Sequence, residues 1–194
     1  MGEEQKVVLV TGAGSGFGRA IAEGLAADGH AVFGTYRRKA ADLSAGVTPV
    51  SLDVTEQVLQ AAGRIDVLVN NAGCGLAGAV EDTSVAEAAA QFDTNLLGMH
   101  RLCRAVLPGM RDRRSGCIVN MSSLAGRIVV PFQGFYCASK FAVEAYTQAL
   151  RMEVREFGIR VALVAPGDFA TGFTANRRLA AGHTAASPYF GRGR

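Results

Sequence analysis

The chain has 194 residues, of which 49% are hydrophobic and 19% charged, and a formal net charge of +3; these values are typical of one globular domain with a hydrophobic core. The small net charge and the lack of a long basic tract exclude nucleic acid as an indicated partner. No apolar run approaches the roughly 18 residues that a membrane span needs, and the N-terminus does not resemble a signal peptide, so we expect a cytoplasmic enzyme or binding protein.

Apolar runs alternate with segments of helical periodicity along the chain. Strands are predicted over residues 6–12, 31–36, 48–54, 65–73, 117–123 and 159–167. Helices are predicted over residues 17–28, 84–113 (as one long helix) and 133–157, with a short helix between Asp53 and Ile65. Strands that are apolar on both faces and alternate with helices indicate an α/β fold, a Rossmann-type doubly wound parallel sheet of about six strands with helices on both faces.

The four cysteines, Cys74, Cys103, Cys117 and Cys137, lack CxxC spacing, and the three histidines are scattered. Neither a zinc site nor a redox pair is therefore predicted. The cysteines are interpreted as small core residues, and we expect no metal site.

The segment TGAGSGFG, residues 11–18, follows the first predicted strand and opens the first predicted helix. Glycines let a backbone turn tightly and approach a phosphate, and a helix N-terminus offers unpaired N–H groups to it. The Gly-Lys-Ser/Thr of a P-loop is absent. At the head of a doubly wound sheet the segment favours a dinucleotide site, with a simple turn as the alternative.

The end of the second predicted strand bears on which dinucleotide binds. A carboxylate there would bind the adenosine ribose and repel a 2′-phosphate, but the sequence has Tyr36 followed by Arg37, Arg38 and Lys39. A guanidinium pairs with a phosphate through two hydrogen bonds. NADP(H) is therefore predicted, with NAD(H) less favoured, and a solvated basic turn is the alternative interpretation.

The segment GFYCASKFAV, residues 134–143, places Tyr136 and Lys140 one turn apart on the same face of a predicted helix. A surface tyrosine beside a surface lysine is one interpretation of this pair. The other is an acid/base site. A free phenol has a pKa near ~10, and an ammonium one turn away, with an oxidised nicotinamide nearby, would lower that pKa towards the range that a base at neutral pH needs.

Further motifs follow in order: LDV with Asp53, NNAG at 70–73, DTNLLG with Asn95, NMSS ending at Ser123, YCASK at 136–140 and PGDFAT at 166–171. In this order and at near-normal spacing, the motifs resemble those of the short-chain dehydrogenase/reductase family, closest in pattern to its branch of 17β-hydroxysteroid and retinol dehydrogenases. The resemblance implies one NADP-binding Rossmann domain over residues 1–175, followed by an irregular or divergent tail over residues 176–194.

The resemblance also implies roles for the matched residues. The phosphate loop would consist of Gly12, Ser15, Phe17 and Gly18, and the adenine would contact Asp53 and Val54. The adenosine side would be lined by Asn71, Ala72 and Gly73. The nicotinamide amide would be held by Phe169 and Thr171, which follow Pro166 and Gly167. Asn95, Ser123, Tyr136 and Lys140 would form the catalytic tetrad. In it Tyr136 is the general acid/base, Ser123 binds the carbonyl oxygen, Lys140 also holds the nicotinamide ribose, and Asn95 anchors a water that relays protons to Lys140. Taken alone, Ser123 could equally be a strand-end hydroxyl, and Asn95 a helix cap or kink.

The activity implied by the resemblance is hydride transfer between NADP(H) and a hydrophobic ketone, aldehyde or secondary alcohol. The apolar segment from Ile128 to Phe132 would help to wall the substrate pocket. One alternative is a 3-oxoacyl-thioester reductase of the same family. The alternative from another class is a non-catalytic or impaired NADP-binding scaffold.

The sequence departs from the family pattern at its end. After Thr171 only 23 residues remain, without an apolar run able to form another strand. Members of the family continue with a substrate-covering loop, a further helix and a seventh strand, and they usually form homo-oligomers. We therefore expect a C-terminally truncated form without the last strand and helix, in which the sixth predicted strand is an exposed edge. A truncated product, an altered reading frame and a natural minimal form are all compatible with this pattern.

Overall fold

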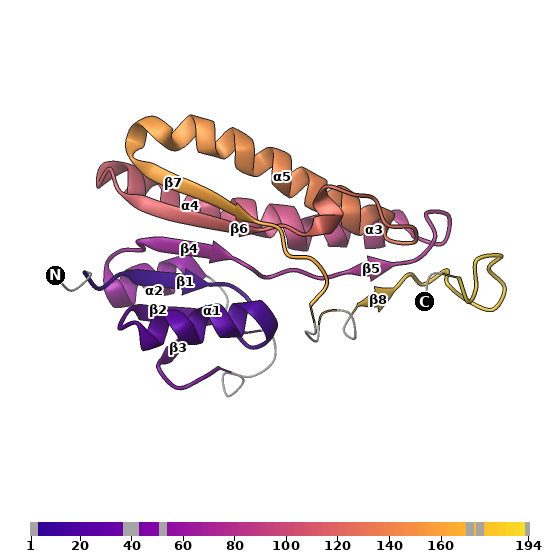
Figure 1. Cartoon of the computed structure of the whole chain (residues 1–194), viewed down its shortest axis with the longest axis horizontal. Coiled ribbons are helices and arrows are strands. Elements are labelled where there is room, and N and C mark those ends of the chain that lie inside the picture. Colours follow the sequence, from indigo (N-terminus) through magenta and orange to yellow (C-terminus); the bar gives the residue numbers. More distant parts are fainter. Residues whose placement is uncertain (1–3, 37–42, 51–53, 170–172, 174–176, 193–194) are drawn as a thin grey trace.

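A computed structural model of the chain describes residues 4–36, 43–50, 54–169, 173 and 177–192. Six strands form a parallel sheet in the order β3-β2-β1-β4-β6-β7 (Figure 1). Their bounds are β1 (Val7–Val10), β2 (Ala31–Thr35), β3 (Val47–Val50), β4 (Val67–Asn70), β6 (Gly116–Met121) and β7 (Ile159–Val164). The predicted Rossmann-type sheet is thus confirmed, and the strand order reverses between β1 and β4, where such sheets bind their ligands.

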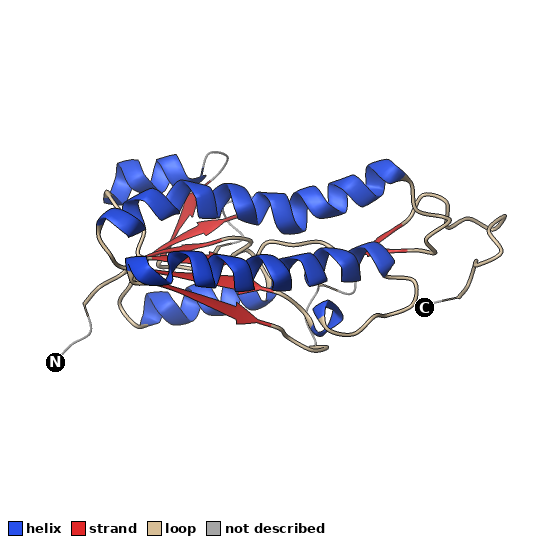
Figure 2. Cartoon of the chain, turned by 90° about the horizontal axis from the view of Figure 1, so that it is seen from above, coloured by secondary structure: helices blue, strands red, loops and turns tan. Residues whose placement is uncertain are grey.

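Helices cover both faces of this sheet (Figure 2). Helix α1 (Gly16–Ala27) packs with apolar residues of β1, β2 and β3 on one face. Helices α2 (Val54–Ala62), α4 (Gly98–Asp112) and α5 (Gly134–Val154) contribute to a larger core cluster that includes Val58, Cys103 and Val143. As the short connection before Ile65 predicts, α2 has only nine residues.

The predicted long helix over residues 84–113 is wrong in one respect. The structure divides it into α3 (Val85–Phe92), a five-residue π turn (Asp93–Leu97) and α4. Helix α3 begins with a capping box in which Ser84 and Glu87 satisfy each other's backbone N–H groups. A π turn is rare and is often found at functional sites, and this one contains Asn95.

The tail carries more structure than an irregular segment. Strand β8 (Arg178–Leu179) pairs in parallel with β5 (Leu76–Ala77) in a second, two-stranded sheet. The carboxylate of Asp82 accepts hydrogen bonds from the hydroxyl of Ser187 at 2.7 and 2.9 Å. The domain boundary near residue 175 stays a prediction. Among the described residues, no helix is both long and apolar enough to span a membrane.

A tight turn before β7 offers a test of the fold. Gly158 has a left-handed φ of +70°, and a Cβ there would lie 2.5 Å from the carbonyl oxygen of Arg114. Gly63 has nearly the same φ, +71°, with no atom within 4 Å of such a Cβ. We expect Gly158→Ala to lower the free energy of unfolding by about 3 kcal/mol, because it adds a backbone clash to the strain of the left-handed conformation.

The matched variant Gly63→Ala isolates the conformational strain, and it is expected to cost only about 1 kcal/mol. Urea denaturation of both variants measures the difference. Equal losses would show that the backbone around Arg114 moves away without cost.

Candidate active site

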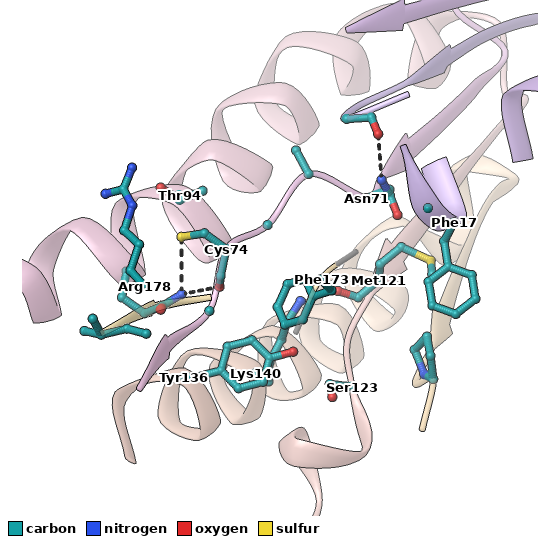
Figure 3. A pocket seen from close by; sticks show the side chains of 18 of the residues that line it. Phe17, Asn71, Cys74, Thr94, Met121, Ser123, Tyr136, Lys140, Phe173 and Arg178 are labelled. Atoms are coloured by element: carbon teal, nitrogen blue, oxygen red, sulfur yellow. Dashed lines mark hydrogen bonds between the residues drawn. The ribbon is translucent and has the colours of Figure 1, made fainter. Parts of the chain in front are cut away.

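A cavity of about 860 Å³ lies at the carboxyl ends of the central strands (Figure 3). It is lined by the glycine-rich turn after β1, the segment after β4, residues of α3, the end of β6, residues of α5 and the segment after β7. Since this is the ligand crevice of doubly wound sheets, the cavity is the candidate active site.

The glycine-rich turn forms one wall of the cavity. A Cβ on Gly18 would lie 2.3 Å from the carbonyl oxygen of Gly12, whose own φ is +67°, so glycine lets α1 approach the turn closely. The N-cap residue of α1, Ser15, makes no side-chain capping hydrogen bond. The N–H groups of the first turn are therefore left for an anion.

The segment after β4 is fixed to this turn by Thr11. The buried Thr11 hydroxyl accepts hydrogen bonds from the backbone N–H of Asn71 at 2.9 Å and of Ala72 at 2.8 Å. The side-chain amide of Asn71 donates to the Thr11 carbonyl at 2.8 Å. With its side chain bound in this way, Asn71 lies at the cavity beside Ala72 and Gly73, as predicted.

Asn95 ties the π turn to the same segment. Its side chain is 4% exposed; its Oδ1 accepts from the backbone N–H of Cys74 at 2.9 Å, and its Nδ2 donates to the Cys74 carbonyl at 3.1 Å and to Ser139 Oγ at 3.0 Å. Asn95 therefore has a structural role in the wall of the cavity. The water relay through Asn95 stays a prediction.

Tyr136 and Lys140 do not form a surface pair. Their exposed fractions are 7% and 6%, and they come from successive turns of α5 (Figure 3). The Lys140 ammonium donates to the Met121 carbonyl at 2.8 Å and lies 6.0 Å from the centre of the Tyr136 ring. Ser123, two residues after the end of β6, lines the cavity together with Tyr136. Three of the four predicted catalytic residues thus meet at the cavity, and Asn95 lies directly behind its wall.

The pKa of Tyr136 differs from the sequence-based expectation. Burial raises the pKa of the phenol, and the nearby Ser123 hydroxyl offsets this only in part. Burial also lowers the pKa of Lys140 to about 8. In the chain alone, burial of the phenol thus opposes the predicted lowering of the Tyr136 pKa. The lowering with an oxidised nicotinamide beside the phenol stays a prediction.

Residues after β7 form the opposite wall. Pro166, Gly167 and Phe169, which are predicted to contact the cofactor, line the cavity. The Phe169 ring meets Phe17 of α1 edge to face at a centroid distance of 5.2 Å, so these two predicted cofactor contacts touch each other in the cavity wall. The Phe173 ring lies 5.6 Å from that of Tyr136.

Some predicted site residues cannot be placed, and the predicted wall of the substrate pocket from Ile128 to Phe132 stays a prediction. Arg37, Asp53 and Thr171 lie outside the described residues, and Val54 begins α2. The segment from Ile128 to Phe132 is absent from the cavity lining; Ile128 is 52% and Val129 73% exposed.

Sequence reasoning missed several lining residues, namely Cys74, Gln91, Thr94, Met121, Phe173, Arg178 and Leu179. Cys74 was interpreted as a core residue, but it lies between the cavity and α3. Gln91 had a recognisable pattern, because it is a polar residue four positions before Asn95 on one face of a helix. The residues of the tail had no such pattern, since their place depends on the pairing of β5 with β8.

Comparisons with known proteins agree with this geometry. The sequence model of a family described as short chain dehydrogenase matches residues 6–181. A 3-ketodihydrosphingosine reductase of Bacteroides thetaiotaomicron is 46% identical over 185 residues, which cover 91% of this chain and 68% of that protein. Retinol dehydrogenase 8 of Homo sapiens is 40% identical over 192 residues, covering 89% and 62%. The chain thus spans about two thirds of the length of these relatives.

Solved structures show the same likeness. A short-chain dehydrogenase from Streptomyces avermitilis has a TM-score of 0.81 and 44% identity, over 87% of this chain and 67% of that one. ElxO, solved with NADP bound, has a TM-score of 0.80 and 30% identity, over 87% of this chain and 75% of that one.

Proposed function

Because the chain belongs to the short-chain dehydrogenase family, we propose that it transfers a hydride between NADP(H) and a hydrophobic ketone, aldehyde or secondary alcohol. The observation that carries the proposal is the buried pair of Tyr136 and Lys140 at the cavity, whose lining also includes Ser123. A phenol and an ammonium are costly to bury, and a merely structural helix does not need them.

The residues around the cavity fit a dinucleotide. The free N–H groups at the start of α1 suit a pyrophosphate, and a Cβ on Gly18 would fill the space through which the turn and α1 approach each other. Asn71, Ala72 and Gly73 would line the adenosine side, and Lys140 would hold the ribose of the nicotinamide. When bound, the dinucleotide supplies or accepts the hydride.

In the direction of reduction, Tyr136 donates its hydroxyl proton to the substrate carbonyl oxygen. The raised pKa of Tyr136 keeps that proton on the phenol until the oxygen becomes basic. Ser123 hydrogen-bonds the same oxygen and stabilises the negative charge that develops on it. In the oxidation of an alcohol, Tyr136 instead accepts the proton of the substrate hydroxyl group.

The choice of an apolar substrate rests on the rest of the cavity wall. Leu76, Phe173 and Leu179 line it beside Tyr136. The names of two relatives, a 3-ketodihydrosphingosine reductase and a retinol dehydrogenase, point to substrates with long apolar parts. We extend that substrate class to this chain. The expected cytoplasmic location is a separate part of the proposal.

Thermal melting tests the cofactor. NADP⁺ at about 100 times its Kd is expected to raise Tm by roughly 5–10 °C, and NAD⁺ at the same concentration by much less, since a ligand of the folded state stabilises it by mass action. Arg37→Ala is expected to remove most of the difference. Arg104→Ala, which removes an exposed arginine of α4, is the matched control.

Equal shifts with the two dinucleotides would contradict the preference for NADP⁺, and no shift with either would contradict the cofactor site. Turnover of NADPH with ketones and acyl thioesters then separates the remaining functions. Preference for an acyl thioester would favour a 3-oxoacyl-thioester reductase, and binding without any turnover would favour a scaffold.

A further inference from the structure

Two side-chain amides hold the backbone of Cys74 at the wall of the cavity. The side chain of Asn95 forms hydrogen bonds with both the backbone N–H and the carbonyl of Cys74. The Nε2 of Gln91 donates to the same carbonyl at 2.8 Å and also approaches the Cys74 sulfur at 3.7 Å. The Cys74 carbonyl thus accepts two hydrogen bonds from one helical segment, one from α3 and one from the π turn.

Gln91 is an unusual residue for this place if its role is packing alone. It is 2% exposed, and its Oε1 is buried without a hydrogen-bond partner among the described residues. A buried, unsatisfied amide oxygen is destabilising, and an apolar side chain of the same size would avoid it. The role of Gln91 therefore lies in the hydrogen bond that its Nε2 donates to the Cys74 carbonyl.

The segment that Gln91 holds lies against Lys140. A Cβ on Gly73 would be 3.3 Å from Asn95 Oδ1 and 3.8 Å from Lys140 Nζ. At its other end, the segment is fixed by the hydrogen bonds from Asn71 and Ala72 to Thr11. Four residues are thus held at both ends, and a movement at Cys74 changes the space between Gly73 and the ammonium.

We propose that Gln91 is a positioning residue, which fixes the Cys74 carbonyl and so sets the cavity wall from Asn71 to Cys74 for the bound dinucleotide. The inference deepens the proposed function and rests on it for the identity of the ligand. Gln91 acts through the backbone of Cys74 and does not itself take part in proton transfer.

Gln91→Met tests this role, because it keeps the length of the side chain and removes the donor. We expect the amide hydrogens of residues 72–75 to exchange with solvent about fivefold to tenfold faster, the size expected for one lost hydrogen bond. The Kd for NADP⁺ is expected to rise by a similar factor. The matched control is Thr147→Val, which removes a hydroxyl that is fully buried between β6 and α5 and bonded to Asn120.

Gln91→Glu supplies a readout that a purely structural role would not produce. Above its pKa the new carboxylate faces the Cys74 carbonyl and repels it, whereas the protonated acid can donate its O–H there. Burial raises the pKa of a carboxyl group, so the ratio of NADP⁺ Kd values between this variant and the wild type should fall towards one as the pH is lowered from about 8 to about 6. The other titratable and charged groups around the site are the same in both proteins, namely Cys74, Glu87, Tyr136, Lys140 and Arg178.

Unchanged exchange of residues 72–75 in Gln91→Met would overturn the inference, even if no dinucleotide bound to the wild type and the proposed function failed. Faster amide exchange with an unchanged Kd for NADP⁺ would overturn the claim that Gln91 sets the cavity wall for the dinucleotide. A Thr147→Val variant with the same local changes would also overturn it, since both variants would then report general loosening. A ratio independent of pH for Gln91→Glu would show that the donated hydrogen bond is not what matters.

Discussion

Replacing Tyr136 by phenylalanine is expected to lower turnover by about 10³-fold or more, while the Kd for NADPH stays within a few-fold. General acid–base catalysis by a positioned group contributes roughly 10²–10⁴-fold, and here a single hydroxyl provides it. The phenylalanine ring fills the same space against Phe173, so the wall of the cavity is preserved. Steady-state turnover and NADPH binding by fluorescence measure the two quantities.

Tyr146→Phe is the matched control. Tyr146 lies on the same helix, and its hydroxyl pairs with His100 rather than with any cavity residue. It is expected to retain turnover within a few-fold. If Tyr136→Phe turned over as fast as Tyr146→Phe, Tyr136 would not be the acid/base, and the proposed mechanism would fail even though the family assignment stands.

Replacing Lys140 by methionine is expected to lower turnover by about 10²-fold or more and to change how stability depends on pH. Burial lowers the pKa of Lys140 from 10.5 to about 8. Between these values the unfolded chain binds a proton that the folded chain does not, so the stability of the wild type rises as the pH increases through this window. The rise is at most about 3 kcal/mol, and it is expected to be absent in Lys140→Met.

Urea denaturation at several pH values between 7 and 10 measures this effect as a difference between the wild type and Lys140→Met. Lys6, which lies near the N-terminus with 43% of its side chain exposed, provides the control Lys6→Met, and this variant should follow the wild type. A parallel pH dependence for all three proteins would show that the Lys140 ammonium is not desolvated in the folded chain.

Much of the fold was predictable because its patterns are local. The buried runs around Val8, Leu68 and Ile118 are apolar on both faces, and such runs indicate parallel strands. The pairing of Tyr136 with Lys140 follows from helical spacing alone. Each of these features depends on residues within a few positions of one another.

Features that depend on distant contacts were not predictable in the same way. The π turn forms around Asn95, whose partners Cys74 and Ser139 are 21 and 44 residues away. The raised pKa of Tyr136 reflects burial, which the motif YCASK does not encode. The strand β8 exists only because Arg178 lies beside Leu76.

The π turn also sets the rotation between the two helices on either side of it. Each residue of an α-helix adds about 100°, and a π turn contains one residue more than the α turn that it replaces. The π turn fits this extra residue into about one rotation, so α3 and α4 keep nearly the relation that a continuous α-helix one residue shorter would give them. If Asp93–Leu97 instead formed α turns with the same number of residues, α4 would rotate by about 100° relative to α3. Met99 and Cys103 would then swing out of the core, or Gln91 away from Cys74. The extra residue and the wide turn around Asn95 therefore depend on each other.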